Sequence, residues 1–377
     1  MNGTPVCPSC CREARRAACS DSTGVPKATD GPGLWSSEGF GGPIEGQAPR
    51  MKSIGLVGVP YSGKSTLFTA LTRTGAAGGR ANQAVVQVPD PRPAVLARLE
   101  DSKKIVQAQV RFVDVPGGAT AQGLAALREV DALCVVVRAF EPGAEPGKEL
   151  AEVTADLLLA DLAVVERSLE NARKRSTARS GGAPGEVQAL ERALASLEKE
   201  RPVREADLSL EDRKILRGLS LLTLKPWVVV ANLEEGSAVP PSLGPDALGV
   251  WAEIEAEAAA LTPEEAGQLL EEFGVTSPGL DRVVAASYRA LDLITFLTTG
   301  PDESRAWEVR RGATVPEAAG VIHTDLQRGF IRAEVVSYDD VVAAGGWDAA
   351  QARGALRVEG KEYVVREGDV LSIRFAV

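Results

Sequence analysis

The chain has 377 residues, of which 44% are hydrophobic, enough for two or three domains with sizeable cores at about 150 residues each. Its 42 lysine and arginine residues are outnumbered by 52 aspartate and glutamate residues. The net charge of −10 argues against binding DNA or RNA through overall charge and leaves only a local basic patch. No run approaches the ~20 apolar residues of a membrane span or resembles a signal peptide. We therefore expect a cytoplasmic monomer with no membrane or DNA partner.

Residues 1–50 differ in composition from the rest of the chain. They contain 14 glycine and proline residues but only five Val, Ile, Leu or Phe, too little apolar surface to offset the entropy of ordering. Four of the five cysteines lie here, at Cys7, Cys10, Cys11 and Cys19. They are too crowded for the two separated ligand pairs of a zinc finger or ribbon. We predict that residues 1–50 form a disordered extension.

From residue 51 onward the pattern predicts alternating strands and helices. A short apolar run at 54–59 ends in a glycine-rich turn, and residues 65–71 have helical character, which indicates strand, loop and helix in that order. Further short apolar runs follow, as expected for parallel strands buried on both faces. They occupy 110–115, 132–137 and 227–231, with a shorter candidate at 248–252. The predicted fold class is α/β with a mainly parallel sheet.

Between about residues 148 and 222 the apolar period changes to the 3–4 spacing of a helix seam. Apolar residues recur at Leu158, Leu162, Val165 and Leu169, and again at Val187, Leu190, Leu194 and Leu197. A glycine-rich break at 180–185 separates the series, so we expect an inserted antiparallel helical hairpin. Its tip carries Arg173, Lys174, Arg175 and Arg179. These cations are either solvated charges, which charge alone favours, or a contact for RNA or another acidic partner.

The last 85 residues have short alternating stretches at 331–335 and 370–375 that suit half-buried strands. A capping box formed by Thr314 and Glu317 predicts the start of a helix. Strands around one or two helices indicate a small α+β domain. His323 is the only histidine and lies near the end of this helix. We expect it to be structural, because no nucleophile or group of metal ligands accompanies it.

A phosphate-binding pattern follows the first predicted strand. The segment Gly58-Val59-Pro60-Tyr61-Ser62-Gly63-Lys64-Ser65 matches G-x-x-x-x-G-K-[ST] between a strand and a helix, where the pattern has physical meaning. Its glycines let backbone N–H groups face phosphate oxygens, Lys64 places a cation against the β and γ phosphates, and the Ser65 hydroxyl is a magnesium ligand. The predicted nucleotide-binding residues here are Gly58, Tyr61, Ser62, Gly63, Lys64, Ser65 and Thr66, with Mg²⁺ as cofactor.

Two further elements follow later strands. Asp114 and Gly117 form a D-x-x-G element, in which the carboxylate holds a magnesium-bound water and the glycine approaches the γ-phosphate. We predict Lys64, Asp114 and Gly117 as catalytic residues and Ser65 and Asp114 as the metal site. The order and distance of these elements favour a GTPase-type protein over a nucleotide kinase, and no basic lid segment is evident.

The third element contains Asn232, Leu233 and Glu235, which stand where guanine-specific proteins have N-K-x-D. We predict that all three residues contribute to base binding. The Glu235 carboxylate lies one methylene too far out for the guanine edge, and Leu233 lacks the long stem with which the usual lysine covers the base. Adenine is therefore the predicted base, although GTP stays an alternative substrate.

From residue 51 to 377 the chain resembles the YchF/Obg-like ATPase family of translation-factor-related P-loop GTPases. The likeness includes the phosphate loop and the segments 88–92, 128–132, 225–226 and 232–235. It is most specific at 305–307, 312–314 and 319–325, and it continues through 329–335 and 367–370. The resemblance implies a G domain at 51–292, a coiled-coil insertion at about 148–222 and a C-terminal β-grasp TGS domain at 293–377. It also implies slow hydrolysis of ATP in preference to GTP, with the ribosome or ribosomal RNA as partner.

The sequence departs from the family at three places near the nucleotide. Family members usually have a switch I threonine that completes the magnesium shell, whereas residues 75–85 contain none. The switch II segment after Gly117 is short, and Tyr61 replaces the usual asparagine of the phosphate loop. We therefore expect a slower ATPase than is usual for the family. The alternative is a nucleotide sensor or RNA-binding adaptor that does not hydrolyse its nucleotide.

Overall fold

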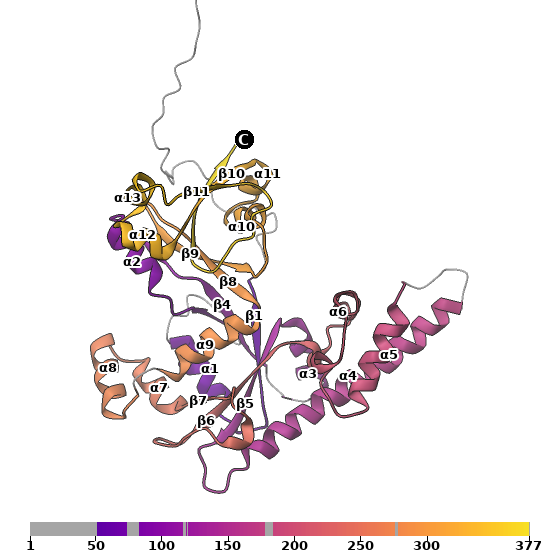
Figure 1. The fold of residues 1–377 in the computed structure, drawn as a ribbon. Coiled ribbons are helices and arrows are strands. Elements are labelled where there is room, and N and C mark those ends of the chain that lie inside the picture. The colour runs from indigo at the N-terminus through magenta and orange to yellow at the C-terminus, as the bar shows by residue number, and fades with distance from the viewer. Residues whose placement is uncertain are drawn as a thin grey trace, which may run out of the picture. The chain divides into compact units, whose positions relative to one another are not determined.

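The computed structural model describes residues 51–73, 83–115, 118, 120–177, 184–275 and 278–376. All of these residues belong to one compact unit, Ser36–Val377. They form two six-stranded sheets and a long helical hairpin (Figure 1). The predicted N-terminal extension, with its four cysteines, lies outside the described residues and stays a prediction.

The first sheet has the strand order β2-β4-β1-β5-β6-β7 and is parallel except for β2, which runs antiparallel to β4. Its strands are β1 (Ser53–Val57), β2 (Gln83–Gln87), β4 (Gln109–Asp114), β5 (Ala132–Ala139), β6 (Trp227–Leu233) and β7 (Leu248–Val250). This arrangement confirms the predicted α/β fold. Strand β2 was missed because it is an edge strand in which only Ala84 and Val86 are buried, so it has no continuous apolar run.

Helices cover both faces of this sheet, which explains the unbroken apolar strands. The helices beside it are α1 (Lys64–Arg73), α3 (Ala121–Glu129), α7 (Ala252–Ala258) and α9 (Gly279–Ala290), whereas α8 (Pro263–Glu272) packs on α7 and α2 (Arg92–Leu99) packs against the second sheet. Ile54 and Leu56 of β1 share one buried cluster with residues of α1, α7 and α9. Val57 and Leu133 belong to another cluster, with residues of α3 and the hairpin. Successive residues of one strand thus belong to the apolar cores on opposite faces of the sheet.

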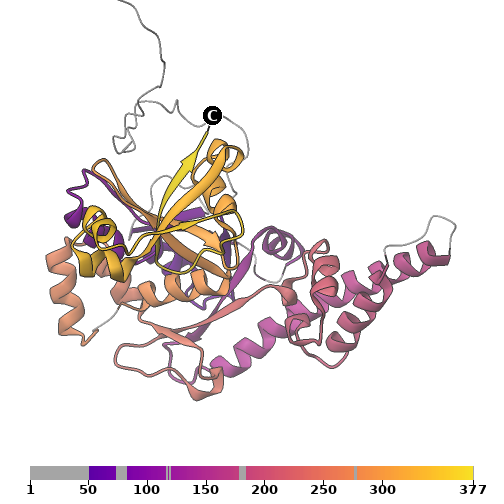
Figure 2. The same ribbon diagram turned by 45° about the horizontal axis from the view of Figure 1, so that its top comes forward.

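The predicted hairpin is confirmed. Helix α4 (Pro146–Thr177) and helix α5 (Glu186–Leu197) lie side by side in Figures 1 and 2, and α6 (Leu210–Arg217) packs beside α5. Val165 and Leu169 of α4 are buried against Leu190 of α5 in one apolar cluster, which is the seam expected from the 3–4 spacing. None of the described helices, including the 32-residue α4, is long and apolar enough to cross a bilayer.

One buried carboxylate joins the hairpin to the first sheet. Asp161 of α4 is fully buried. It accepts hydrogen bonds from the backbone N–H of Leu222 at 3.0 Å and of Thr223 at 2.7 Å, and from the Thr223 hydroxyl at 2.8 Å. Arg128 of α3 completes the group with an ion pair at 3.1 Å. Because its partners belong to two other segments, this carboxylate fixes the position of α4 relative to α3 and to the turn before β6.

The second sheet has the order β11-β10-β12-β8-β9-β3. Its strands are β8 (Leu293–Thr298), β9 (Ser304–Arg310), β10 (Phe330–Ser337), β11 (Arg357–Glu359), β12 (Asp369–Phe375) and β3 (Ile105–Val106), and its helices are α10 (Val315–Ile322), α11 (Thr324–Arg328), α12 (Tyr338–Ala344) and α13 (Trp347–Ala352). The capping box of Thr314 and Glu317 opens α10 as predicted. His323 caps α11 by accepting the Asp325 N–H, which agrees with a structural role.

Two details of the C-terminal part differ from the sequence prediction. Residues 293–376 contain four helices, so the expectation of one or two helices is wrong. The extra ones have only five to seven residues, too short for a hydrophobic period to stand out. The edge strand β3 comes from residues 105–106 and pairs in parallel with β9. A strand of two residues has no sequence signal of its own.

An arginine links the segment after β2 to the second sheet. Arg92 binds the Asp90 carboxylate through two nitrogens, at 2.7 and 2.9 Å, and forms an ion pair with Glu367 at 2.6 Å. Glu367 also accepts the backbone N–H of Thr295 in β8 at 2.9 Å. These two acids raise the pKa of Arg92 above its ordinary value against the opposing effect of burial. The segment 88–92, singled out by the family resemblance, therefore contributes to the junction of the two sheets.

The buried carboxylate of α4 gives a prediction about stability. Replacing Asp161 by alanine leaves two backbone N–H groups without their acceptor and removes the carboxylate that pairs with Arg128, so we expect the free energy of unfolding to fall by about 3–5 kcal/mol. The measurement is a urea titration followed by circular dichroism. The control is Asp156→Ala, because Asp156 is half-buried on the same helix and has no bonded partner among the described residues. Equal effects of the two substitutions would contradict the role of Asp161.

Candidate functional site

The phosphate-binding segment lies at the carboxyl end of β1, and its shape is imposed by the two next strands. A Cβ atom on Gly58 would collide with the carbonyl oxygen of Val136 in β5. A Cβ on Gly63 would collide with the side-chain amide of Asn232, and Gly63 has a left-handed φ of +86° that favours glycine. The two glycines of the sequence motif are thus required by close packing and by backbone conformation as well as by access to phosphate.

Lys64 begins helix α1 and points back into the loop. Its ammonium donates to the carbonyl oxygens of Gly58 at 2.9 Å and Val59 at 2.7 Å. Burial lowers the pKa of Lys64, while the charges of Asp114 and Glu149 oppose this shift. The structure therefore holds a partly buried cation at the mouth of a loop whose helix also presents its positive N-terminal end.

Asp114 ends β4 beside this lysine. Burial raises the pKa of Asp114, and the Lys64 charge and a hydrogen bond from the Ser65 hydroxyl oppose that rise. The structure thus brings together Lys64, Ser65 and Asp114 as the sequence predicted. Oxygen ligands of this kind suit Mg²⁺, which usually takes one or two protein ligands and completes its shell with phosphate oxygens and water. Within the described ranges no three His, Cys, Asp or Glu side chains form a metal cluster.

Asn232, at the end of β6, supports the loop from the other side. It is 8% exposed, and its amide donates to the Ser62 carbonyl oxygen at 3.4 Å. The hydroxyl of Ser62 is fully buried and has no hydrogen-bond partner in the part of the chain that the structure describes. Asn232 therefore positions the phosphate loop, which is a second role beside the predicted one at the base.

The remaining predicted residues differ in their exposure to solvent. Tyr61 is 87% exposed and has a φ of +64°, an uncommon conformation for a bulky residue. Thr66 and Glu235 are exposed, whereas the Leu233 side chain is buried in the core near Val239 and Gly249. Any contact of Leu233 with a nucleotide must then come from its backbone. Gly117 and residues 74–82 of the switch I segment lie outside the described residues, so their predicted roles stay predictions.

One residue near the site was missed by sequence reasoning. Glu149 is buried in the first turn of α4 and accepts hydrogen bonds from the backbone N–H of Arg138 at 2.9 Å and from its Nε at 3.0 Å. Burial lowers the pKa of Lys64, and the Glu149 charge opposes this shift and so favours the protonated ammonium. An acid in the first turn of a helix is common, and nothing in the sequence relates Glu149 to the phosphate loop.

Comparison with known proteins gives matches along nearly all of the described chain. Residues 53–166 match the family model of 50S ribosome-binding GTPases, and residues 293–376 match a model of the C-terminal part of YchF GTPases, which is described as a protein of unknown function. The ribosome-binding ATPase YchF of Bacillus subtilis is 38% identical over 361 residues, covering 86% of this chain and 99% of that protein.

Two further relatives agree with this result. The ribosome-binding ATPase YchF of Escherichia coli O157:H7 is 37% identical over 358 residues, with 86% of this chain and 99% of that protein covered. The solved structure of the Schizosaccharomyces pombe YchF GTPase superposes with a TM-score of 0.76 at 30% identity, covering 86% of this chain and 97% of that one. The likeness therefore extends across both sheets and the hairpin.

The packing of the loop glycines gives a second prediction. We expect Gly63→Ala to weaken binding of a fluorescent ATP analogue by at least about 10-fold, because the new methyl group displaces Asn232 and strains the left-handed backbone. Gly143→Ala is the matched control, since Gly143 has a similar φ of +84° but no atom within 4 Å of its Cβ position. The control should lose about 1 kcal/mol of stability and no affinity. Unchanged affinity in Gly63→Ala would contradict the proposed loop geometry.

Proposed function

Since the chain belongs to the YchF family, we propose that it binds ATP together with Mg²⁺, hydrolyses it slowly and acts as a nucleotide-dependent switch on the ribosome. The observation that carries this proposal is the grouping of Lys64, Ser65 and Asp114 at the carboxyl edge of a parallel sheet. The names of the relatives support the reaction and the ribosome as partner.

The chain's own groups account for nucleotide binding. On binding, the Lys64 ammonium exchanges the carbonyl oxygens of Gly58 and Val59 for phosphate oxygens, and the backbone N–H groups of the loop surround the β-phosphate. Ser65 and Asp114 would hold Mg²⁺, directly and through water respectively. The metal, when bound, supplies positive charge that offsets the charge developing on the transferred phosphoryl group. Gly117 is proposed to contact the γ-phosphate.

Slow turnover follows from the groups that position the attacking water. Residues 75–85 contain no threonine, and the nearest glutamine after Asp114, Gln122, is exposed on α3. Loss of one preorganised group of this kind typically costs about 2.7–4 kcal/mol, which is a factor of 10²–10³ in rate. Binding does not depend on these groups, so a nucleotide sensor or RNA-binding adaptor without hydrolysis is the second candidate.

The base site favours adenine over guanine. Because the Leu233 side chain is buried, it offers no stem to cover the base, and the exposed Glu235 has a longer side chain than the aspartate that accepts both guanine N–H groups. Backbone groups near Leu233 are left to recognise the adenine amino group. The names of the relatives include both ATPase and GTPase, so preference must be measured on this protein.

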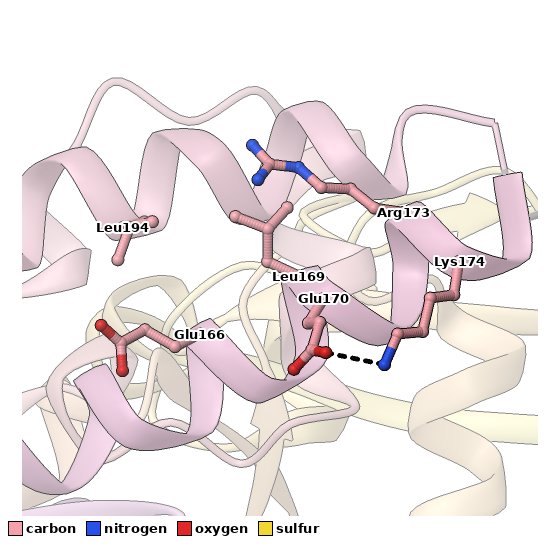
Figure 3. Close-up of a pocket in the computed structure, with 6 residues that line it drawn as sticks. All are labelled: Glu166, Leu169, Glu170, Arg173, Lys174 and Leu194. Atoms are coloured by element: carbon pink, nitrogen blue, oxygen red, sulfur yellow. Dashed lines mark hydrogen bonds and ion pairs between the residues drawn. The ribbon is translucent and has the colours of Figure 1, made fainter. Parts of the chain in front are cut away.

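We propose that the protein contacts the ribosome or ribosomal RNA in the cytoplasm and that it acts as a monomer. The hairpin tip was one predicted contact. However, Arg173 pairs with Glu191 at 2.8 Å, Lys174 with Glu170 at 2.7 Å and Arg175 with Glu186 at 2.7 Å. Figure 3 shows the Lys174–Glu170 pair beside a hollow between α4 and α5. These acids reduce the positive potential around three of the four tip cations, so the tip is a weaker candidate than its sequence indicated. The fourth, Arg179, lies outside the described residues.

Turnover separates the two candidate functions. In single-turnover assays with excess enzyme and magnesium, we expect ATP hydrolysis at well under about one per second, and a loss of both affinity and hydrolysis in Lys64→Ala. Lys148→Ala is the control, because Lys148 is exposed and pairs only with Glu145 among the described residues. ATP binding without any hydrolysis would support the sensor. Turnover near one per second would show that the missing switch I threonine is harmless.

Nucleotide preference is tested by displacement of a fluorescent ATP analogue. We expect ATP to bind at least about 10-fold more tightly than GTP, since a guanine N–H without its acceptor costs the full desolvation of that group. Glu235→Asp should shift the ratio toward GTP several-fold, whereas Glu234→Asp, at the neighbouring exposed position, should not. Tighter binding of GTP by the unmodified protein would contradict the proposed base site.

A further inference from the structure

The segment after β6 offers no side chain that covers a base. Leu233 stands where guanine-specific proteins have the covering lysine, and its side chain is buried near Val239 and Gly249. Glu234 and Glu235 are exposed acids, which present charge and little apolar surface. Contact with an apolar or aromatic group is what removes a purine ring from water. Such a contact has to come from a neighbouring element of the same sheet edge.

Trp251 stands beside this segment in the sheet. Strands β6 and β7 are parallel neighbours (Figure 1), and Asn232 of β6 is paired with Val250, the last residue of β7. Trp251 follows that pair in one strand as Leu233 follows it in the other. Trp251 also packs against the apolar cluster to which Leu233 belongs. The ends of parallel strands meet at one edge, so the fold brings Trp251 to the predicted base site although the two residues are far apart in the sequence.

A buried carboxylate fixes the backbone at this point. Glu255 of α7 is 4% exposed and accepts the N–H groups of Gly279 at 2.9 Å and Leu280 at 2.7 Å. Burial raises the pKa of Glu255, and hydrogen bonds from the backbone of Leu280, Gly279 and Trp251 oppose this rise. The carbonyl oxygen of Trp251 in turn accepts the Glu255 N–H at 2.9 Å. Trp251 is therefore held between β7, α7 and the start of α9, which leaves its backbone little freedom.

Trp251 is an unusual residue at the start of a helix. It occupies the N-cap of α7 and makes no side-chain cap hydrogen bond, whereas Ser, Thr, Asp and Asn are preferred there because their side chains accept a free N–H. The next helix, α8, begins in the preferred way with a capping box of Thr262 and Glu265. Positions that break a local rule are expected at functional sites. The stability of α7 thus does not explain a tryptophan at this place.

The fold uses only part of the Trp251 indole. The side chain is half-buried, so part of it packs against the cluster and part stays open to solvent. Trp227 donates its indole N–H to the Leu222 carbonyl oxygen at 3.2 Å, and Trp307 donates to the Thr298 hydroxyl at 2.9 Å. The Trp251 indole has no such partner in the part of the chain that the structure describes. An indole with an open surface at a ligand-binding edge is suited to contact with another flat ring.

We propose that the Trp251 indole packs on the purine ring of the bound nucleotide. The inference rests on the proposed function, in which a nucleotide occupies the phosphate loop. Stacking on an aromatic side chain favours every base, because each base has a π face. Trp251 therefore adds affinity for ATP and GTP alike. The preference between them comes from Glu235 and from the backbone near Leu233.

Tryptophan fluorescence of the full chain tests the contact directly. Titration with ATP and magnesium should quench the emission to a saturating level, and Trp251→Phe should remove most of that change. Trp347→Phe is the matched control, because Trp347 is also half-buried, begins the helix α13 and packs against a different apolar cluster. The control should keep the full change. A change that persists in Trp251→Phe comes from another tryptophan and overturns the proposal.

Calorimetric titrations separate the base from the phosphates. Trp251→Ala should weaken the binding of ATP and of GTP by the same factor, at least about 5-fold, because base stacking is lost. Inorganic tripolyphosphate has no base and should bind the variant and the unmodified protein equally. Unchanged ATP affinity in Trp251→Ala overturns the proposal. An equal loss of tripolyphosphate affinity also overturns it, since the whole site would then have changed.

A second variant separates loss of the indole from loss of stability. Trp251→Ser gives α7 a preferred N-cap residue, which compensates in part for the lost packing. Its urea midpoint should therefore lie closer to that of the unmodified protein than the midpoint of Trp251→Ala does. Its ATP affinity should nevertheless fall as far as that of Trp251→Ala. ATP affinity that recovers together with the urea midpoint overturns the proposal.

These outcomes distinguish the inference from the proposed function. If ATP binds through Trp251 but is not hydrolysed, or if the protein does not sediment with ribosomes, the proposed switch fails and the role of Trp251 stands. If ATP is bound and slowly hydrolysed but none of the Trp251 variants changes its affinity, the role of Trp251 fails and the proposed function stands.

Discussion

The nucleotide site depends on close contact between the phosphate loop and the two strands beyond it. Gly58 lies against the backbone of β5, and Gly63 lies against Asn232 at the end of β6. No side chain fits at either position, so the loop has little freedom to adopt another path. This packing places Lys64 and Ser65 at the start of α1 opposite Asp114. The three groups meet because the sheet is parallel and their strands end at the same edge.

Buried charged groups likewise fix the positions of elements that are far apart in the sequence. Asp161 joins α4 to α3 and to the turn before β6, Arg92 joins Asp90 to Glu367, and Glu149 holds Arg138 while facing Lys64. Each group is partnered, as burial of charge requires. The hairpin and the second sheet are therefore fixed to the first sheet by directional polar contacts as well as by apolar packing, and those contacts define geometry more narrowly than an apolar interface does.

The sequence was sufficient for the features that have a local signal. Continuous apolar runs predicted β1, β4, β5 and β6, and the 3–4 spacing predicted the hairpin. The motif Gly58–Ser65 located the phosphate loop because close packing requires glycine at Gly58 and Gly63. Elements whose stability comes from distant partners were missed, such as β3, which exists by pairing with β9, and Glu149, whose role comes from packing. Burial of Leu233 was equally hidden, since a leucine at the end of a strand can lie either in the core or at the surface.

The phosphate loop presents positive charge to a ligand in a form that packing fixes. Its backbone N–H groups and the partly buried Lys64 ammonium are held in place, so a nucleotide meets a small preorganised site that salt screens only weakly. The hairpin differs physically, because Arg173, Lys174 and Arg175 carry their charges on exposed side chains that are paired with acids. Counterions compete directly with such charges. Nucleotide binding should therefore depend less on salt than any contact made through these three cations.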